Sequence, residues 1–362
     1  MGDAAPVGRQ ERALARATPE RWGMEKIAQE VDEGVYRFRL ASPSGLVVNA
    51  WLLRHDGGLT LVDTGFPKTV DQLEAGLQSL GCALRDVDHV LYTHTHVDHM
   101  GGGVALGDRW DALQWAWTHP ASVFEDYVGH WERIPNHVEG FGVRLPDTPL
   151  RHAAMERLRL TPTSAYPSDR KVGLRNLQPV APGESIAVGS LRLRCILADG
   201  HDPGHIVWLD ETRGWAFSGD VVLNVPTPIV QYMGDRLPPY LRTLDRLAAA
   251  PIRKLFPGHG MSTVLVDQSL DRSRGYLRTQ YDQLARGLEG HALDPLALLL
   301  QVLDGERRAP VARYGILLAN YLALLDAMSA LGYATQEADK RWRAARPWPR
   351  WEEAEVALKA LP

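Results

Sequence analysis

Cysteine is scarce in this sequence. Only Cys82 and Cys195 occur among 362 residues, and neither has a second cysteine nearby, which argues against a cysteine-based zinc site. Both are interpreted as buried thiols. So little cysteine is compatible with a reducing compartment, and we expect the protein to be cytoplasmic.

The chain also lacks the features of membrane and secreted proteins. No run of eighteen apolar residues is present, whereas a membrane-spanning helix needs about 20. The first thirty residues are charged and lack the continuous apolar core of a secretory signal. We therefore expect neither a membrane span nor export.

An excess of positive charge is absent too. The formal net charge is −4, so the whole molecule has no basic field of the kind that attracts nucleic acid. Near the C-terminus, basic residues between Lys340 and Arg350 alternate with tryptophans, a pattern that can bind nucleic acid. Acidic residues follow at once from Glu352, which favours a solvated packing arm over a nucleic-acid site.

Histidine and aspartate, by contrast, gather in one short segment. His94, His96, Asp98 and His99 fall within six positions, directly after an apolar, strand-like segment. Imidazole nitrogens and carboxylate oxygens are the ordinary protein ligands of zinc and similar ions. His94 and His96 can converge if the backbone between them is extended or turning, and the next two can then serve a second ion. A histidine-rich surface loop is the alternative, but the clustering favours a metal site.

This segment resembles the signature of the metallo-β-lactamase-fold hydrolases. Later loops offer the family's further ligands in order, namely His201, Asp220 and His259, each after a β-like run. The resemblance covers roughly residues 30–265 and is nearest to the glyoxalase II and β-lactamase-like protein 2 branches. Residues 199–203 read Asp-Gly-His-Asp-Pro where Pro-Gly-His-Thr-Pro is commoner, which leaves His201 and His205 as alternatives for the third ligand. His201 matches the first histidine of the family motif and is favoured.

The resemblance implies an α/β fold, an αββα sandwich with its metals at one edge of two facing sheets. Glycines at 101–103 permit close backbone approach, and the next helix is predicted to begin near Val104. Three segments are predicted: an N-terminal arm at 1–24, a catalytic domain at 25–267 with an insertion at about 108–185, and a helical C-terminal domain at 268–362. The last resembles the winged-helix-like part of the β-lactamase-like protein 2 group.

The resemblance also implies a dinuclear metal centre, with zinc favoured over iron or manganese. A metal-bound hydroxide would be the nucleophile, and Asp98 is the predicted catalytic residue that helps to orient it. Asp63 is interpreted as support beneath the metals, with a strand-ending turn as the alternative. The implied ligands are His94, His96 and His201 for the first ion, Asp98, His99 and His259 for the second, and Asp220 as a bridge.

The predicted insertion is rich in aromatic residues between Trp110 and Trp131. Core packing explains most of them, but a long insertion beside a metal loop is often a substrate wall. Tyr127 and Trp131 are therefore predicted to contact substrate. The histidines of this segment lack ligand spacing and are interpreted as solvent-exposed or hydrogen-bonding residues: His119, His130, His137 and His152.

Such a centre determines the reaction class better than the substrate. The closest branches favour a hydrolase that cleaves a small-molecule thioester or related ester. A phosphodiesterase or nuclease is the first alternative, followed by a lactonase, and a mononuclear-iron sulfur dioxygenase is an alternative of a different class. A non-catalytic binding module is least favoured, because no ligand of the family's set is missing.

Overall fold

The computed structural model describes residues 27–42, 45–127, 129–130, 144–153, 174–223, 225–227, 236–304 and 311–362. The predicted N-terminal arm, Trp131 and His137 lie outside these ranges. Within them, no helix combines the length and the hydropathy that crossing a membrane would require.

Seven strands form the first sheet, in the order of the chain. The first four strands pair antiparallel, and β4 to β7 are parallel. Asp56-Gly57, a dipeptide typical of hairpin turns, turns the chain between β3 and β4. The strands are β1 (Ala28–Asp32), β2 (Val35–Ala41), β3 (Val47–His55), β4 (Gly58–Val62), β5 (Val87–Leu91), β6 (Leu113–Ala116) and β7 (Leu177–Pro179).

Five strands form the second sheet, in the order β12-β11-β10-β9-β8. Neighbours pair antiparallel except for β11 and β12, which are parallel. The strands are β8 (Ser185–Val188), β9 (Leu191–Leu197), β10 (Ile206–Asp210), β11 (Trp215–Gly219) and β12 (Lys254–Pro257).

The two sheets face each other across an aromatic layer. Trp51 of β3 meets Phe256 of β12 edge to face, with ring centroids 5.2 Å apart, and Phe256 stacks on Phe217 of β11. Alternate residues of β3, such as Leu52, point instead to the cluster under the helices of the first sheet. Strands buried on both faces need nearly continuous apolar sequence, which explains the apolar run in β3.

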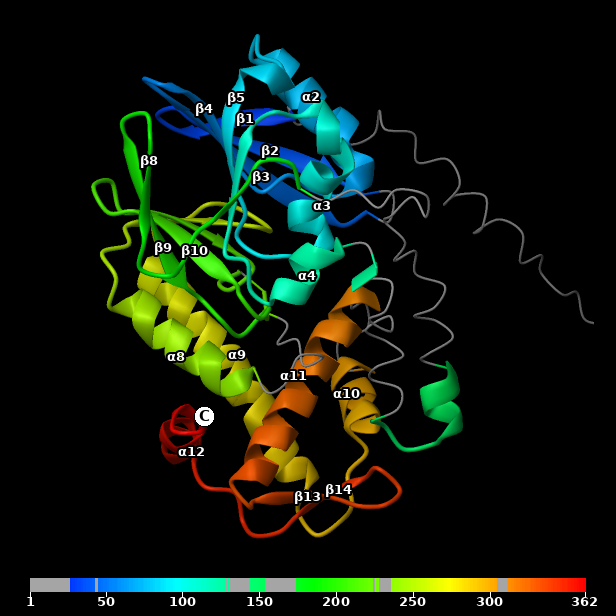
Figure 1. Cartoon of the computed structure of the whole chain (residues 1–362). Coiled ribbons are helices and arrows are strands. Elements are labelled where there is room, and N and C mark those ends of the chain that lie inside the picture. Colours follow the sequence, from blue (N-terminus) through cyan, green and yellow to red (C-terminus); the bar gives the residue numbers. More distant parts are fainter. Residues whose placement is uncertain are drawn as a thin grey trace, which may run out of the picture.

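Helices cover the outer face of each sheet (Figure 1). Val70, Leu73 and Leu77 of α2 pack on the first sheet, at the spacing that places apolar residues on one face of a helix. Leu241 and Leu244 of α8 pack on the second sheet. The predicted αββα sandwich is therefore confirmed. The covering helices are α2 (Val70–Ser79), α3 (Val97–Leu106) and α4 (Ala121–Glu125) on one side, and α8 (Leu237–Ala248) and α9 (Val266–Gly287) on the other.

The C-terminal part is helical, as predicted. A two-stranded sheet follows α11, and the tryptophans at 342 and 351 are buried while most of the basic residues around them are exposed. One apolar cluster joins α8 of the sandwich to these helices, and the boundary at 267 stays a prediction. The elements are α10 (Pro295–Asp304), α11 (Val311–Ala330), β13 (Ala334–Gln336), β14 (Trp342–Ala344) and α12 (Trp351–Lys359).

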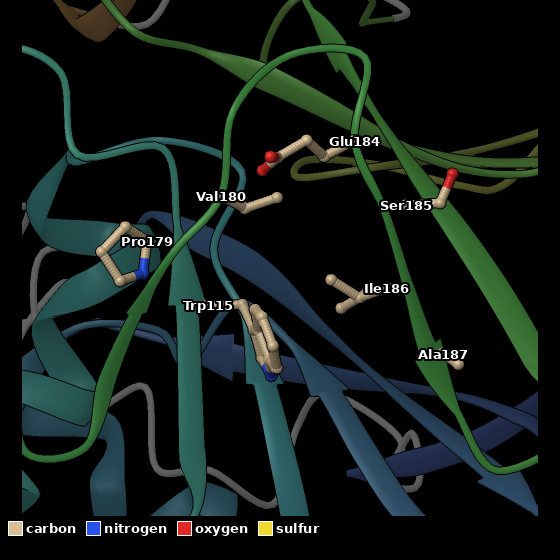
Figure 2. A pocket seen from close by; sticks show the side chains of 7 residues that line it. All are labelled: Trp115, Pro179, Val180, Glu184, Ser185, Ile186 and Ala187. Carbon is tan, nitrogen blue, oxygen red and sulfur yellow. The ribbon is translucent and has the colours of Figure 1, made fainter.

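The predicted insertion at 108–185 contributes β6 and β7 to the first sheet. A hollow of about 520 Å³ opens where these strands approach β8 of the second sheet. Figure 2 shows Trp115, Val180 and Ile186 around it, with Glu184 at its rim. None of the predicted metal ligands lines this hollow.

Candidate metal centre

The predicted ligands converge at one edge of the sandwich, although they lie on four separate segments of the chain. The first segment joins β5 to the start of α3, and the other three follow β9, β11 and β12. The side chains form two groups, and within each group one nitrogen or oxygen atom from every residue lies within 4.8 Å of the others. The groups are His94, His96 and His201, and Asp98, His99, Asp220 and His259.

In the first group, ring nitrogens face one another. Nδ1 of His96 lies 3.0 Å from Nε2 of His201. The ring of His94 meets both of the other rings edge to face, at centroid distances of 4.7 and 5.0 Å. Three imidazoles therefore surround one small volume.

Asp220 lies between the two groups. Its Oδ2 is 3.8 Å from Nε2 of His201 and 3.2 Å from Nε2 of His259, while its Oδ1 is 3.4 Å from Nε2 of His99. Oδ2 of Asp98 is 3.3 Å from Nε2 of His259. A carboxylate placed in this way can serve both groups at once, because it has two oxygens.

The donor set fits divalent cations. Nε2 of His94, Nε2 of His99 and Oδ1 of Asp220 are buried and make no hydrogen bond among the described residues. Buried polar atoms are normally hydrogen-bonded, and leaving them unsatisfied costs free energy. Several such atoms converge here, all of types that zinc prefers, so these residues fit a metal site.

The electrostatics of the second group also suit a cation. Burial alone would raise the pKa of Asp98, but His99 and His259 outweigh it and lower that pKa to about 2. Burial would lower the pKa of His259, yet Asp220 and Asp98 raise it to about 10. The same two carboxylates, with Asp63, raise the pKa of His99. The group therefore holds ionised carboxylates that positive charge must neutralise.

Asp63 supports this group from behind, as expected. Its Oδ1 accepts a hydrogen bond from the backbone N–H of Thr93, and its Oδ2 accepts one from the hydroxyl of the same residue. Oδ2 also lies 2.8 Å from Nδ1 of His99. A proton held on Nδ1 by a carboxylate leaves Nε2 of that ring free for an ion.

Strand β3 supports His259, a contact that the sequence does not predict. The carbonyl of Val47 accepts a hydrogen bond of 2.6 Å from Nδ1 of His259. The amide of Asn49 donates to the carbonyls of Pro257 and Gly260, which flank that histidine. The available signal is Asn49 itself, a polar residue within an apolar strand.

His205 lies in neither group. Its ring stacks on that of His94 with centroids 4.6 Å apart, and its Nε2 accepts a hydrogen bond of 3.2 Å from the backbone N–H of Asp220. Burial and neighbouring imidazoles hold its pKa well below the usual range. The geometry therefore favours His201 over His205 as the third ligand, because His205 faces the backbone of the Asp220 loop.

Removing these two histidines should have unequal effects. We expect His201→Ala to lose about one metal equivalent, because it removes a converging donor. His205→Ala should keep both equivalents and weaken affinity by roughly 10-fold, as loss of a contact behind a ligand does. Elemental analysis and chelator titration of both variants measure this. The opposite order would show that the third ligand is His205.

The described part of the insertion touches the metal loop without adding a donor. The hydroxyl of Tyr127 donates a hydrogen bond of 2.7 Å to the carbonyl of Thr95, and Tyr127 is only 5% exposed. Nε2 of His152 lies 2.7 Å from Oδ1 of Asp147, and the ring of His119 stacks on that of Trp117. His130 is buried, and no histidine described in this segment joins either group. Substrate contact by Tyr127 stays a prediction.

Comparisons with known proteins bear on the fold and the family of this chain. The profile of the metallo-beta-lactamase superfamily matches residues 43–259. The beta-lactamase-like protein 2 homolog of Caenorhabditis elegans is 23% identical over 230 residues, which cover 63% of this chain and 60% of that protein. The hydroxyacylglutathione hydrolase of Rhodobacter capsulatus is 27% identical over 271 residues, which cover 72% of this chain and 79% of that protein. The atrochrysone carboxyl ACP thioesterase of Emericella nidulans is 23% identical, and the match covers 61% of this chain and 54% of that protein.

Two solved structures show the same fold. A metallo-beta-lactamase family protein from Thermus thermophilus has a TM-score of 0.67 at 24% identity, covering 87% of this chain and all of that one. A beta-lactamase domain protein from Burkholderia ambifaria has a TM-score of 0.68 at 22% identity, covering 90% and 97%.

Proposed function

The chain belongs to the metallo-β-lactamase superfamily and is a metal-dependent hydrolase, and from this premise we propose that it cleaves a thioester or related ester at a dinuclear centre. The observation that carries the proposal is the pair of ligand-type groups that share Asp220. The thioester is favoured because one relative is named a thioesterase and another a hydroxyacylglutathione hydrolase.

The metal-holding roles follow from the two groups. His94, His96 and His201 would hold one ion, the second group would hold the other, and Asp220 would contribute to both. When bound, two divalent ions would supply Lewis acidity and would lower the pKa of a coordinated water from near 16 to roughly 7. We propose zinc on the nitrogen-rich donor set, with iron or manganese as alternatives.

The protein's own groups position the reaction. Asp98 is ionised at neutral pH and is proposed to orient the attacking water by accepting a hydrogen bond from it. Asp63 and the Val47 carbonyl hold the rings of two ligands in place. A thiol nucleophile is not needed, and Cys195 is unsuited to the role, because burial raises its pKa to about 12. A small-molecule substrate and a cytoplasmic location complete the proposal.

A substrate panel tests the proposed function. The purified protein would be assayed with acyl thioesters, simple esters, lactones and phosphodiesters, each before and after treatment with a chelator. We expect the highest kcat/KM with a thioester, loss of activity after chelation, and recovery on addition of Zn²⁺. Preference for a phosphodiester or a lactone would replace the thioester assignment. Oxygen consumption with a persulfide, in iron-loaded protein, would overturn the hydrolytic assignment.

Metal uptake should release protons. Without metal, His259 is protonated at pH 7, because Asp220 and Asp98 raise its pKa to about 10, and the same carboxylates raise the pKa of His99. An ion needs the lone pairs of these rings, so binding must displace at least the proton of His259, and affinity should rise with pH until about pH 10. Calorimetry in buffers of different ionisation enthalpy counts the protons. Uptake of two equivalents without proton release would contradict this charge arrangement.

The insertion is proposed to form part of the substrate wall, and Tyr127→Phe tests it. This change removes the hydroxyl that holds the Thr95 carbonyl and keeps the ring, so we expect altered kcat/KM ratios between substrates with metal content unchanged. Tyr281→Phe is the matched control, because that hydroxyl also donates to a backbone carbonyl, at Pro349 in the C-terminal part. Each change should cost about 1 kcal/mol of stability. Kinetics alike in both variants would assign Tyr127 to the core.

A further inference from the structure

Asp202 is a buried carboxylate that no proposed role yet uses. It follows His201 directly, and its side chain is only 1% exposed. Its Oδ2 accepts a hydrogen bond of 3.0 Å from the hydroxyl of Thr95 and one of 3.4 Å from the backbone N–H of that residue. These hydrogen bonds connect the loop after β9 to the residue between His94 and His96.

The other oxygen of this carboxylate faces a proposed ligand. Oδ1 of Asp202 lies 3.5 Å from Nε2 of His96. The opposite ring nitrogen, Nδ1, lies 3.0 Å from Nε2 of His201, inside the first group. The two nitrogens of His96 therefore have different surroundings, since one faces a carboxylate and the other faces imidazole donors.

A neutral imidazole carries its single proton on one of the two nitrogens. A carboxylate beside Nε2 favours the form with the proton there, because its negative charge attracts the N–H proton and repels the lone pair of a bare nitrogen. The lone pair of Nδ1 is then directed to the first group. The alternative form would place a proton at the position where an ion needs a donor atom.

The second group contains a related but shorter contact between a buried carboxylate and a histidine. Oδ2 of Asp63 lies 2.8 Å from Nδ1 of His99, and both side chains are almost fully buried. In that ring, Nε2 is the nitrogen that faces Asp98 and Asp220. Each group thus contains one histidine with one ring nitrogen directed into the group and the other ring nitrogen directed at a buried carboxylate.

We propose that Asp202 is a positioning residue for the first ion, because its carboxylate holds His96 with the proton on Nε2 and with Nδ1 directed at the metal. This inference rests on the proposed metal centre. Thr95 has a part in it, since its hydroxyl and N–H fix the carboxylate in place. Asp202 does not itself bind the ion.

The test is Asp202→Asn, which keeps the shape and removes the charge. Zn²⁺ affinity would be measured against a chromophoric chelator, and we expect one of two equivalents to weaken by about 10- to 100-fold. Imidazole ¹⁵N NMR of the metal-free protein, at a pH where His96 is neutral, reads the proton position directly. We expect protonated Nε2 in the wild type and a mixture of the two forms in the variant.

Asp210→Asn is the matched control. Asp210 is also 1% exposed, but it is bound by Arg213 and the turn after β10, and it belongs to neither group. This control should leave metal affinity and the His96 proton unchanged. If Asp202→Asn does not fold, Thr95→Val supplies the second test, because it frees one side of the carboxylate and should weaken the same equivalent to a smaller extent.

The outcomes separate this inference from the proposed function. A variant that binds both equivalents with wild-type affinity and keeps the proton on Nε2 would overturn the role of Asp202 and leave the metal centre intact. A wild-type protein that binds no divalent ion would overturn the metal centre. In that case the proton position of His96 would still report whether Asp202 controls the ring.

Discussion

Replacement of Asp220 by alanine should abolish hydrolysis and release most of the bound metal in one step. Its carboxylate approaches donor atoms of both groups, with Oδ2 at 3.8 Å from Nε2 of His201 and 3.2 Å from Nε2 of His259. Removal of groups behind a ligand already costs 10- to 100-fold in metal affinity, so loss of the shared ligand should cost more than about 100-fold in activity. Elemental analysis and kcat/KM on the best substrate measure both effects.

Asp220→Asn refines this test, because it keeps the volume and one oxygen while removing the charge. We expect it to retain more metal than the alanine variant and to remain strongly impaired. Asp210→Asn serves as the control for loss of a buried carboxylate outside the site. Full metal content with loss of activity in Asp220→Ala would assign Asp220 to substrate binding and contradict its shared role.

Replacement of Gly258 by alanine should damage the centre almost as severely without removing any ligand. A Cβ atom at this position would lie 2.4 Å from Oδ1 of Asp220 and 2.5 Å from Cε1 of His99. Real Cβ atoms essentially never approach so closely, and neither neighbour can move without leaving its group. We expect loss of at least one metal equivalent and a fall in kcat/KM of about 100-fold.

Two further glycines separate this steric effect from a general effect of alanine. A Cβ added at Gly275 on α9 would have no atom within 4 Å, so alanine there should be neutral or stabilising by roughly 0.5–1 kcal/mol. Gly260 also has open space but a φ of +87°, so alanine there should cost backbone strain only. Equal metal loss in the Gly258 and Gly260 variants would mean that loop conformation, and not the Cβ contact, is responsible.

The ligand-type residues can be placed from sequence because the order of the motifs is local information. The first residue of α3, by contrast, cannot be predicted from the sequence. The sequence predicts a start near Val104, since three glycines precede it and glycine weakens helices, but α3 begins at Val97 and contains all three. The reason is tertiary: a Cβ at Gly102 would lie 2.3 Å from the carbonyl oxygen of Thr64. Close packing on that turn requires glycine and outweighs its low helix propensity.

The supporting contacts also lie beyond sequence reasoning. Asn49 holds the carbonyl of Pro257, which lies 208 positions further along the chain, and Asp202 lies against Thr95 across 107 positions. Such pairs depend on how the two sheets pack against each other, and no local sequence pattern records that packing. Asp63 is an exception, because it resembles a family position, whereas Asp202 stands out in the sequence only as a departure from the common motif.

The division of the proposed ligands between the two sheets has a consequence for the stability of the metal centre. The segment after β5 carries His94 to His99, and the segments after β9, β11 and β12 carry the remaining donors. Neither half of the sandwich holds a complete set for either ion. An ion at this edge would cross-link the two halves, and such a cross-link closes a long loop of chain. Hydrolysis would then depend on the packing of the two sheets against each other. If the sheets separated at that edge, the ions would be lost and activity would fall before the chain unfolds.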